Sequence, residues 1–148
     1  MPELVESVDV DAPVERVWAV LVDWPRQGEW MLATDVRPVG GDAQGIGGRL
    51  AATTGIRLGG RRRGVLDPME ITAWQPPHRV VVRHTGRVVR GDGVFEVRPR
   101  GAGATLVWRE LLDLPLGALG RLGWPLVRPL ARAGVRRSLR RFAAVAES

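Results

Sequence analysis

The sequence predicts a single α+β domain over residues 1–148, in which an antiparallel sheet of about seven strands packs against one long C-terminal helix. Three observations support this class. A strand and a helix open the chain, short turns rich in glycine and proline separate about six further strand-like runs, and helical spacing follows Pro115 to the end. Short connections make neighbouring strands antiparallel, and 148 residues suit one domain with a buried core.

The first elements are a strand and a helix. Val8 and Val10 alternate with polar residues, a period of two that suits a half-buried strand. Pro13 suits the first position of a helix. The apolar residues that follow repeat every three or four positions and predict one apolar helical stripe: Val14, Val17, Trp18, Leu21 and Val22. Asp23-Trp24-Pro25 ends this helix, because a residue before proline disfavours the helical region, and a second short helix follows.

Six further strand-like runs are separated by turn residues. They cover residues 34–39, 49–54, 64–74, 79–85, 93–98 and 104–112. The glycine-rich segment 40–48 superficially suggests a phosphate-binding loop. A true loop of that kind joins a strand to a helix, whereas here another strand follows. We therefore interpret the segment as a flexible hairpin loop.

The C-terminal segment has helical spacing with two irregularities. Leu116, Leu119 and Leu122 predict a short amphipathic turn. Pro125 and Pro129 lie one turn apart, so the helix is expected either to kink there or to start afresh near Pro129. Beyond the prolines, small side chains would leave space beneath the helix: Ala131, Ala133 and Gly134.

A segment near the N-terminus carries a family pattern. Residues 10–18, Val-Asp-Ala-Pro-Val-Glu-Arg-Val-Trp, are followed by Asp23-Trp24-Pro25 and then by Glu29-Trp30. This pattern resembles the SRPBCC superfamily of START-like proteins, often labelled polyketide cyclase/dehydrase, and the resemblance covers nearly the whole chain. It implies a helix-grip fold, in which the curved sheet wraps the last helix and leaves a cavity between them. In that family a loop such as residues 40–48 often rims the mouth of the cavity.

Composition narrows the classes of function. The chain has no cysteine, which excludes disulfides and thiolate catalysis. The net charge of +6 comes from arginine with no lysine, which resembles the codon bias of a GC-rich genome, so we expect no nucleic-acid partner. No run reaches the roughly eighteen apolar residues of a membrane span, and no signal sequence opens the chain. A cytoplasmic protein without stable membrane insertion is expected.

Neither a metal nor a cofactor is expected. The two histidines, His78 and His84, are too few for a typical zinc site without cysteine, unless carboxylates contribute. None of Ser7, Ser138 and Ser148 lies at the strand-to-helix turn that presents a serine nucleophile.

Alternation within the strands indicates which side chains face the last helix. It groups Val82 with His84 in one run, and Trp108 with Glu110 in another. A one-residue bulge would reverse such an assignment. Together with aromatic residues near the ends of elements, these rows give the candidate ligand-binding residues: Trp30, Met69, Ile71, Val82, His84, Phe95, Trp108, Glu110 and Trp124. Glu6 shares a row with Val8 and Val10 and is expected to face the same cavity.

Three functions fit such a fold. The favoured one is binding of a hydrophobic small molecule, such as a lipid, a polyketide-like compound or an isoprenoid, in the cavity. The first alternative, implied by the family label, is a metal-free cyclase/dehydrase in which His84 and Glu110 act as general acid and base on an enolisable carbonyl. The chain has no tyrosine, which counts against a rich acid/base set. The protein is expected to be a monomer or a homodimer.

The second alternative is an interaction module that uses the last helix. This helix carries a run of arginines: Arg132, Arg136, Arg137, Arg140 and Arg141. Such a run is usually a solvated face. The other interpretations are weak contact with an anionic membrane surface and contact with an acidic protein.

Overall fold

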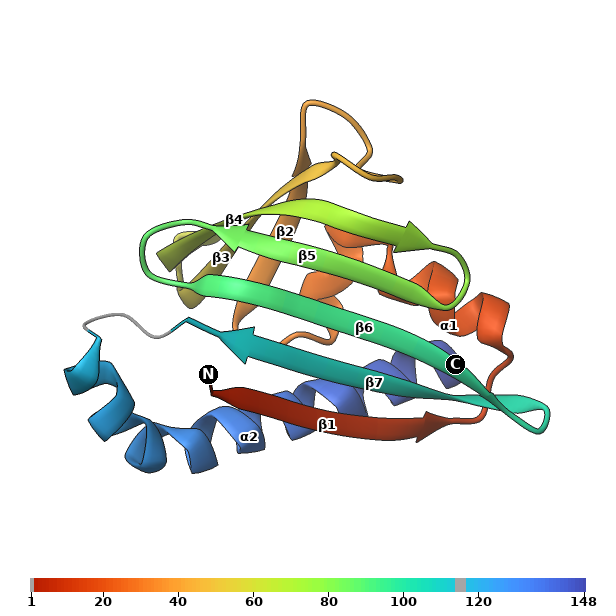
Figure 1. The fold of residues 1–148 in the computed structure, drawn as a ribbon. Helices are drawn as coiled ribbons and strands as arrows, with labels where there is room; N and C mark the ends of the chain where they lie inside the picture. The colour runs from red at the N-terminus through yellow and green to blue at the C-terminus, as the bar shows by residue number, and fades with distance from the viewer. Residues whose placement is uncertain (1, 114–116) are drawn as a thin grey trace.

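The computed structural model describes residues 2–113 and 117–148. Within these residues, seven strands form one antiparallel sheet in the order β1-β7-β6-β5-β4-β3-β2 (Figure 1). The elements in chain order are β1 (Glu3–Val10), α1 (Val14–Leu21), the 3-10 helix η1 (Trp24–Glu29), β2 (Thr34–Val39), β3 (Arg49–Leu58), β4 (Arg61–Gln75), β5 (Arg79–Thr85), β6 (Arg90–Arg100), β7 (Gly103–Leu112) and α2 (Ala118–Glu147).

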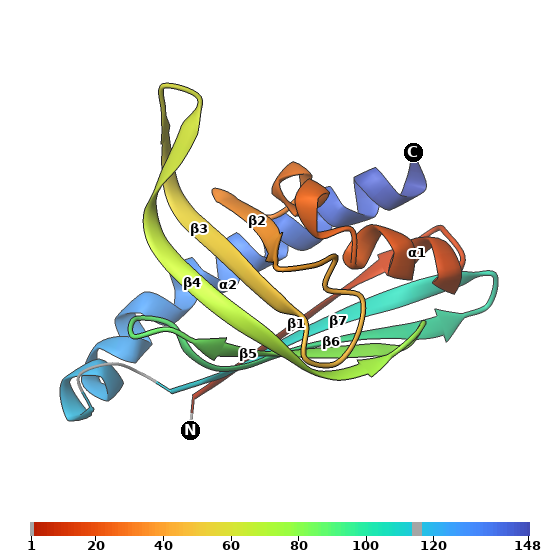
Figure 2. The same ribbon diagram turned by 90° about the horizontal axis from the view of Figure 1, so that it is seen from above.

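The sheet curls around α2, and this arrangement confirms the α+β helix-grip fold. Figure 2 shows β3 and β4 turning away from the plane of β5, β6 and β7, so that α2 runs along the concave side of the sheet. Helix α1 packs against β6, β7 and α2, and so covers one end of the space between the sheet and α2. The core between these elements is apolar and includes Val17, Leu21, Ile71, Leu106, Leu139 and Phe142. The buried stripe of α1 holds it against this core.

Strands β3 and β4 extend beyond the predicted runs 49–54 and 64–74, to Leu58 and from Arg61 respectively. Gly55 and Gly64 lie opposite each other in the β3–β4 register, and the hairpin continues beyond them. A Cβ atom at Gly64 would lie only 2.0 Å from the carbonyl oxygen of Thr54. Glycine here permits a close approach of two backbones, a role it has inside strands as well as at turns.

Helix α2 continues through Pro125 and Pro129, so it does not start afresh near Pro129. Figure 1 shows its first part bending away from the line of the later turns. Proline removes a local hydrogen bond, and the packing of α2 on β1 and α1 keeps the later part of the helix in place. Leu116, part of the predicted amphipathic turn, lies outside the described residues.

Glu6 faces α2, as its row in β1 predicted, but it does not line the cavity between the sheet and α2, which corrects its assignment to that cavity. Its carboxylate accepts hydrogen bonds from the guanidinium groups of Arg132 and Arg136 on α2. Burial alone would raise the pKa of Glu6, but the hydrogen bonds from Arg136 and Arg132 and their charges bring it below its usual value. The two ion pairs therefore attach α2 to the edge strand of the sheet, and two of the arginines predicted as a solvated run have a structural partner.

Candidate ligand-binding site

A cavity of about 420 Å³ lies between the concave face of the sheet and α2. Its wall is mainly apolar, with side chains that include Leu4, Val36, Leu50, Met69, Phe95 and Val135. Ala131 and Gly134 of α2 also line it, so two of the three small residues lie where the sequence predicted space. Ala133 instead lines a separate groove on α2. The volume is in the range of small-molecule sites.

Six of the nine candidate residues line this cavity: Met69, Val82, His84, Phe95, Trp108 and Glu110. They come from β4, β5, β6 and β7, and their side chains share the concave face because side chains alternate along each strand. Alternation in these strands was therefore assigned to the correct face.

The other three candidates lie elsewhere. Trp30 is buried in the core, with its ring edge-on to Trp108 at 6.3 Å and to Phe142 at 5.0 Å between ring centroids. Ile71 is fully buried in the core and does not line the cavity. Trp124 lies on the first part of α2 and lines the separate groove instead. Trp30 and Trp124 were predicted to line the cavity because they lie near the ends of elements, and this prediction was wrong for both.

A polar cluster at one side of the cavity links three strands. The His84 ring on β5 has Nδ1 at 2.9 Å from both carboxylate oxygens of Asp67 on β4, and Nε2 at 3.2 Å from Oε2 of Glu110 on β7. The indole Nε1 of Trp108 donates to Oε1 of Glu110 over 2.8 Å. The three ionisable side chains are 7–15 % exposed. We call these four residues the Asp67–His84–Glu110–Trp108 cluster.

The contacts of the cluster favour a charged histidine. An ionised carboxylate only accepts hydrogen bonds, so with both carboxylates ionised each ring nitrogen must carry a proton. Burial alone would lower the pKa of His84, but the hydrogen bonds with Asp67 and Glu110, together with their charges, raise it to about 10. The ring is therefore an imidazolium at neutral pH, and both of its N–H groups are used.

Asp67 was missed by the sequence analysis, although a signal was available. It lies two residues before Met69 in β4, and the same period of two that placed Met69 inward places Asp67 inward as well. Asp67 lies inside the predicted run 64–74, but only the apolar residues Met69 and Ile71 of that run were taken as its inward row. Gly93 of β6 makes room for the cluster, because a Cβ atom there would lie 3.0 Å from Oε1 of Glu110.

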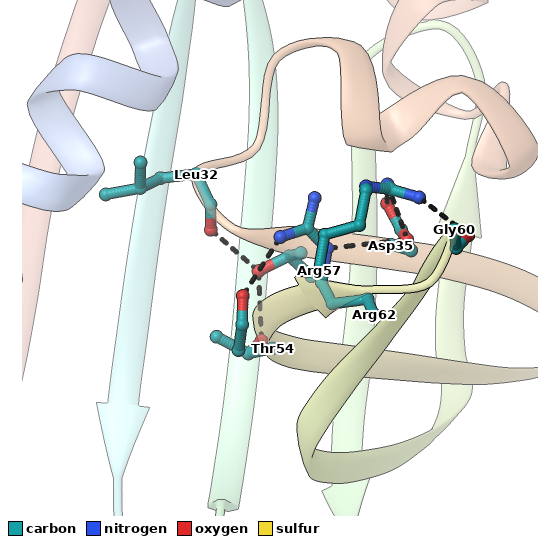
Figure 3. Close-up of polar contacts among 8 residues, drawn as sticks. Leu32, Asp35, Thr54, Arg57, Gly60 and Arg62 are labelled. Atoms are coloured by element: carbon teal, nitrogen blue, oxygen red, sulfur yellow. Dashed lines mark hydrogen bonds and ion pairs between the residues drawn. The ribbon is translucent and has the colours of Figure 1, made fainter.

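A second polar group supports the cavity at the β2–β3 side. The hydroxyl of Thr34 donates to the carbonyl of Leu32 and shares a hydrogen bond with the hydroxyl of Thr54. Asp35 instead accepts hydrogen bonds from Arg57, and Arg62 lies 3.4 Å from the same carboxylate (Figure 3). Because Thr34 and Thr54 line the cavity and neighbouring Asp35 does not, alternation in β2 directs hydroxyls inward and the ion pairs outward.

The loop 40–48 does not line this cavity, unlike the loop expected from the family resemblance. Its backbone is held against β4, since Gly47 donates to Ile71 and Ile71 donates to Gly48. The indole of Trp24 also donates to the carbonyl of Ala43. These bonds attach the loop to β4 and to η1.

Metal binding and membrane crossing have no support among residues 2–113 and 117–148. Neither range contains a group of three or more potential side-chain ligands that could hold a metal ion. None of the helices described there is long and apolar enough to span a membrane.

The fold and the cavity together define a class of small domains that enclose a space between a curved sheet and a helix. The family model described as polyketide cyclase/dehydrase and lipid transport matches residues 1–147. The chain therefore belongs to this SRPBCC-type family, as the N-terminal pattern predicted. No curated protein matches the sequence significantly.

Solved structures from several bacteria share the fold. Protein TTHA0849 of Thermus thermophilus is 20% identical with a TM-score of 0.76, and the match covers 98% of this chain and 97% of that one. The Aha1 dimer of Colwellia psychrerythraea is 11% identical with a TM-score of 0.70, over 99% and 97% of the two chains. Protein Ms6760 of Mycobacterium smegmatis is 19% identical with a TM-score of 0.68, over 97% and 89%.

Proposed function

We propose that this protein binds a hydrophobic small molecule in the cavity between the sheet and α2. The observation that carries the proposal is the wall itself: a space of about 420 Å³ with mainly apolar side chains and one compact polar cluster. An apolar ligand gains from burying its surface there, and a few polar groups set its orientation. A lipid, a polyketide-like compound and an isoprenoid all have this character, and the family description names lipid transport and polyketide chemistry.

The acid/base alternative has less support from the geometry. A general base needs a free lone pair facing the substrate, whereas both nitrogens of His84 lie within hydrogen-bond distance of carboxylates. Glu110 accepts hydrogen bonds from His84 and Trp108, and these bonds fix the orientation of its carboxylate in the wall. The cluster is thus better suited to orienting a ligand than to moving its protons. Cytoplasmic location and a monomeric or homodimeric state stay predictions, and one relative of the same fold was solved as a dimer.

Filling the cavity from α2 is expected to block binding. Ala131→Phe places a ring in the cavity wall, and we expect it to weaken binding of the neutral dye N-phenyl-1-naphthylamine by at least about tenfold, since an overfilled site must expand or lose ligand contacts. The measurement is a fluorescence titration of the dye with each protein.

Ala133→Phe is the matched control, because Ala133 lies on the same helix but outside the cavity. We expect its dye affinity to equal that of the unchanged protein. Equal affinity of the Ala131→Phe protein would place the dye elsewhere and contradict the proposal.

A second candidate function concerns the first part of α2. Its leucines are strongly exposed, with Leu122 at 75%, Leu126 at 81% and Leu130 at 76%. The helix carries arginines throughout and its only acidic residue is Glu147. A helix with exposed leucine and arginine side chains matches the chemistry of an anionic lipid surface, which offers negative charge beside an apolar layer. We therefore propose that α2 contacts anionic membranes reversibly.

Vesicle sedimentation tests this contact. The protein is expected to bind phosphatidylcholine vesicles only when they contain phosphatidylglycerol, and less at high salt. Replacing both Leu122 and Leu126 by serine should weaken binding by about tenfold or more, because exposed apolar side chains enter the interface. The control replaces Ile46 and Ile56 by serine, two isoleucines that lie outside α2 and are 73% and 66% exposed. This change should leave vesicle binding unchanged. Self-association through the leucines without vesicle binding would contradict the proposal and indicate a second copy as partner.

A further inference from the structure

Among the charged side chains that line the cavity, negative charges outnumber positive ones. Among the described residues, the charged groups in the cavity wall are Asp67, His84 and Glu110. None of the arginines in the described ranges lines the cavity, although the chain has a net charge of +6. Two arginines of α2, Arg132 and Arg136, bond instead to Glu6, and Arg57 of β3 bonds to Asp35, all outside the cavity. The cavity is thus an acidic interior in a basic protein.

The charge of the cluster follows from its contacts. Two nitrogen–carboxylate contacts, to Asp67 and to Glu110, need two protons between them. With both protons on His84, the ring is +1 and the two carboxylates are −1 each. If one proton moves to a carboxyl group, the ring becomes neutral and that carboxyl group loses its charge. The sum is −1 in both cases, so the result does not depend on where the proton lies.

The hydrogen-bond capacity that remains is acceptor capacity. The cluster has three N–H donors, two on His84 and one on Trp108, and each of them already points to a carboxylate oxygen. The four carboxylate oxygens have about two lone pairs each, so acceptor positions are left over. Toward the cavity, the cluster therefore offers oxygen lone pairs and negative charge, and no free N–H group.

We propose that the ligand is a hydrophobic molecule whose polar head donates hydrogen bonds or carries positive charge, a hydroxyl or an amine, and that the cavity rejects carboxylates and phosphates. An anionic head beside the cluster would meet like charge in a water-poor site and would find no donor there. A hydroxyl or ammonium head would fill the vacant acceptor positions. The hydroxyls of Thr34, Thr54 and Ser138 elsewhere in the wall are uncharged and do not offset the negative charge. This inference rests on the proposed function of the cavity.

A matched set of probes tests the inference with the unchanged protein. The probes share a naphthalene ring and differ in the head: 2-naphthalenemethanol, 2-naphthalenemethylamine, 2-naphthoate and, without a head, 2-methylnaphthalene. Calorimetry at pH 7 should give the methanol and methylamine compounds at least about tenfold higher affinity than naphthoate, because a single charged hydrogen bond or a like-charge contact has an effect of this size. The Ala131→Phe protein shows whether each probe occupies the cavity.

A charge-neutralising variant with a matched control sharpens the test. Glu110→Gln brings the charge of the cluster from −1 to zero and adds an amide donor, so naphthoate should gain about tenfold relative to the methanol compound. Glu96→Gln makes the same chemical change in β6 at a residue that does not line the cavity, and it should leave the ratio unchanged.

The outcomes separate the inference from the proposed function. Preference for the methanol and methylamine compounds over naphthoate supports both. Naphthoate binding in the cavity as tightly as these compounds overturns the inference and leaves hydrophobic binding intact. Absence of binding by all four probes, 2-methylnaphthalene included, overturns the proposed function and the inference with it.

Discussion

Replacing His84 by alanine is expected to lower the free energy of unfolding by about 3–5 kcal/mol at pH 7, the range found when one partner of a buried charge pair is removed. Asp67 and Glu110 would then stay together in a mostly buried space without the cation that separates them. Their repulsion and their lost hydrogen bonds act in the same direction. Urea unfolding followed by tryptophan fluorescence measures the change.

His78→Ala is the matched control for this experiment. His78 is the other histidine of the chain, an exposed residue in the turn before β5, and its ring Nδ1 lies 3.3 Å from the carbonyl oxygen of Val97. We expect it to change the unfolding free energy by about 1 kcal/mol or less. Similar losses for the two variants would show that the Asp67–His84–Glu110–Trp108 cluster contributes no special stability.

Raising the pH is expected to destabilise the protein through His84. Its pKa is about 10 in the folded protein, above the ordinary histidine value of 6.5. A raised pKa means that the folded state holds the proton more tightly, so this stabilisation is complete below pH 6.5 and is lost as the pH rises through 10. Between these values the free energy of unfolding should fall by about 1.4 kcal/mol per pH unit.

The composition of the chain makes this titration unusually clean. The chain has no cysteine, tyrosine or lysine, the side chains that ordinarily titrate between pH 8 and 10. Besides His84, only the terminal amine is expected to titrate near this range. Urea unfolding at pH 7, 8, 9 and 10 should therefore show a decline in the unchanged protein and a nearly flat profile in His84→Ala. Parallel profiles for both proteins would mean that His84 is not charged in the folded state.

Strand alternation explains why much of the site could be predicted. A half-buried strand repeats every two residues, so one correctly oriented apolar residue orients its whole strand. Val82 therefore placed His84, and Trp108 placed Glu110, without knowledge of the distance between the strands. The contact between His84 and Glu110 depends on how β5, β6 and β7 pair across the sheet, which no single strand encodes.

The remaining features depend on partners far along the chain. Glu6 was assigned to the cavity because its row in β1 is apolar, but arginines about 130 residues later bind it at the edge of the sheet. Trp30 and Trp124 lie near ends of elements, and only the packing of α2 decides which of them is in the core and which is on the helix surface. The close approach of the two backbones at Gly55 depends on its pairing with Gly64, which the sequence of either strand alone does not reveal.

The most direct test of ligand binding in the cavity uses the tryptophan indole signals in a proton–nitrogen NMR spectrum. The six tryptophans sample the molecule: Trp108 lies in the cavity wall with its Nε1 on Glu110, and Trp124 lies in the groove outside. On titration with 2-naphthalenemethanol, the Trp108 indole signal is expected to shift and saturate while the Trp124 signal stays in place. A saturating shift at Trp124 with an unchanged Trp108 signal would contradict ligand binding between the sheet and α2.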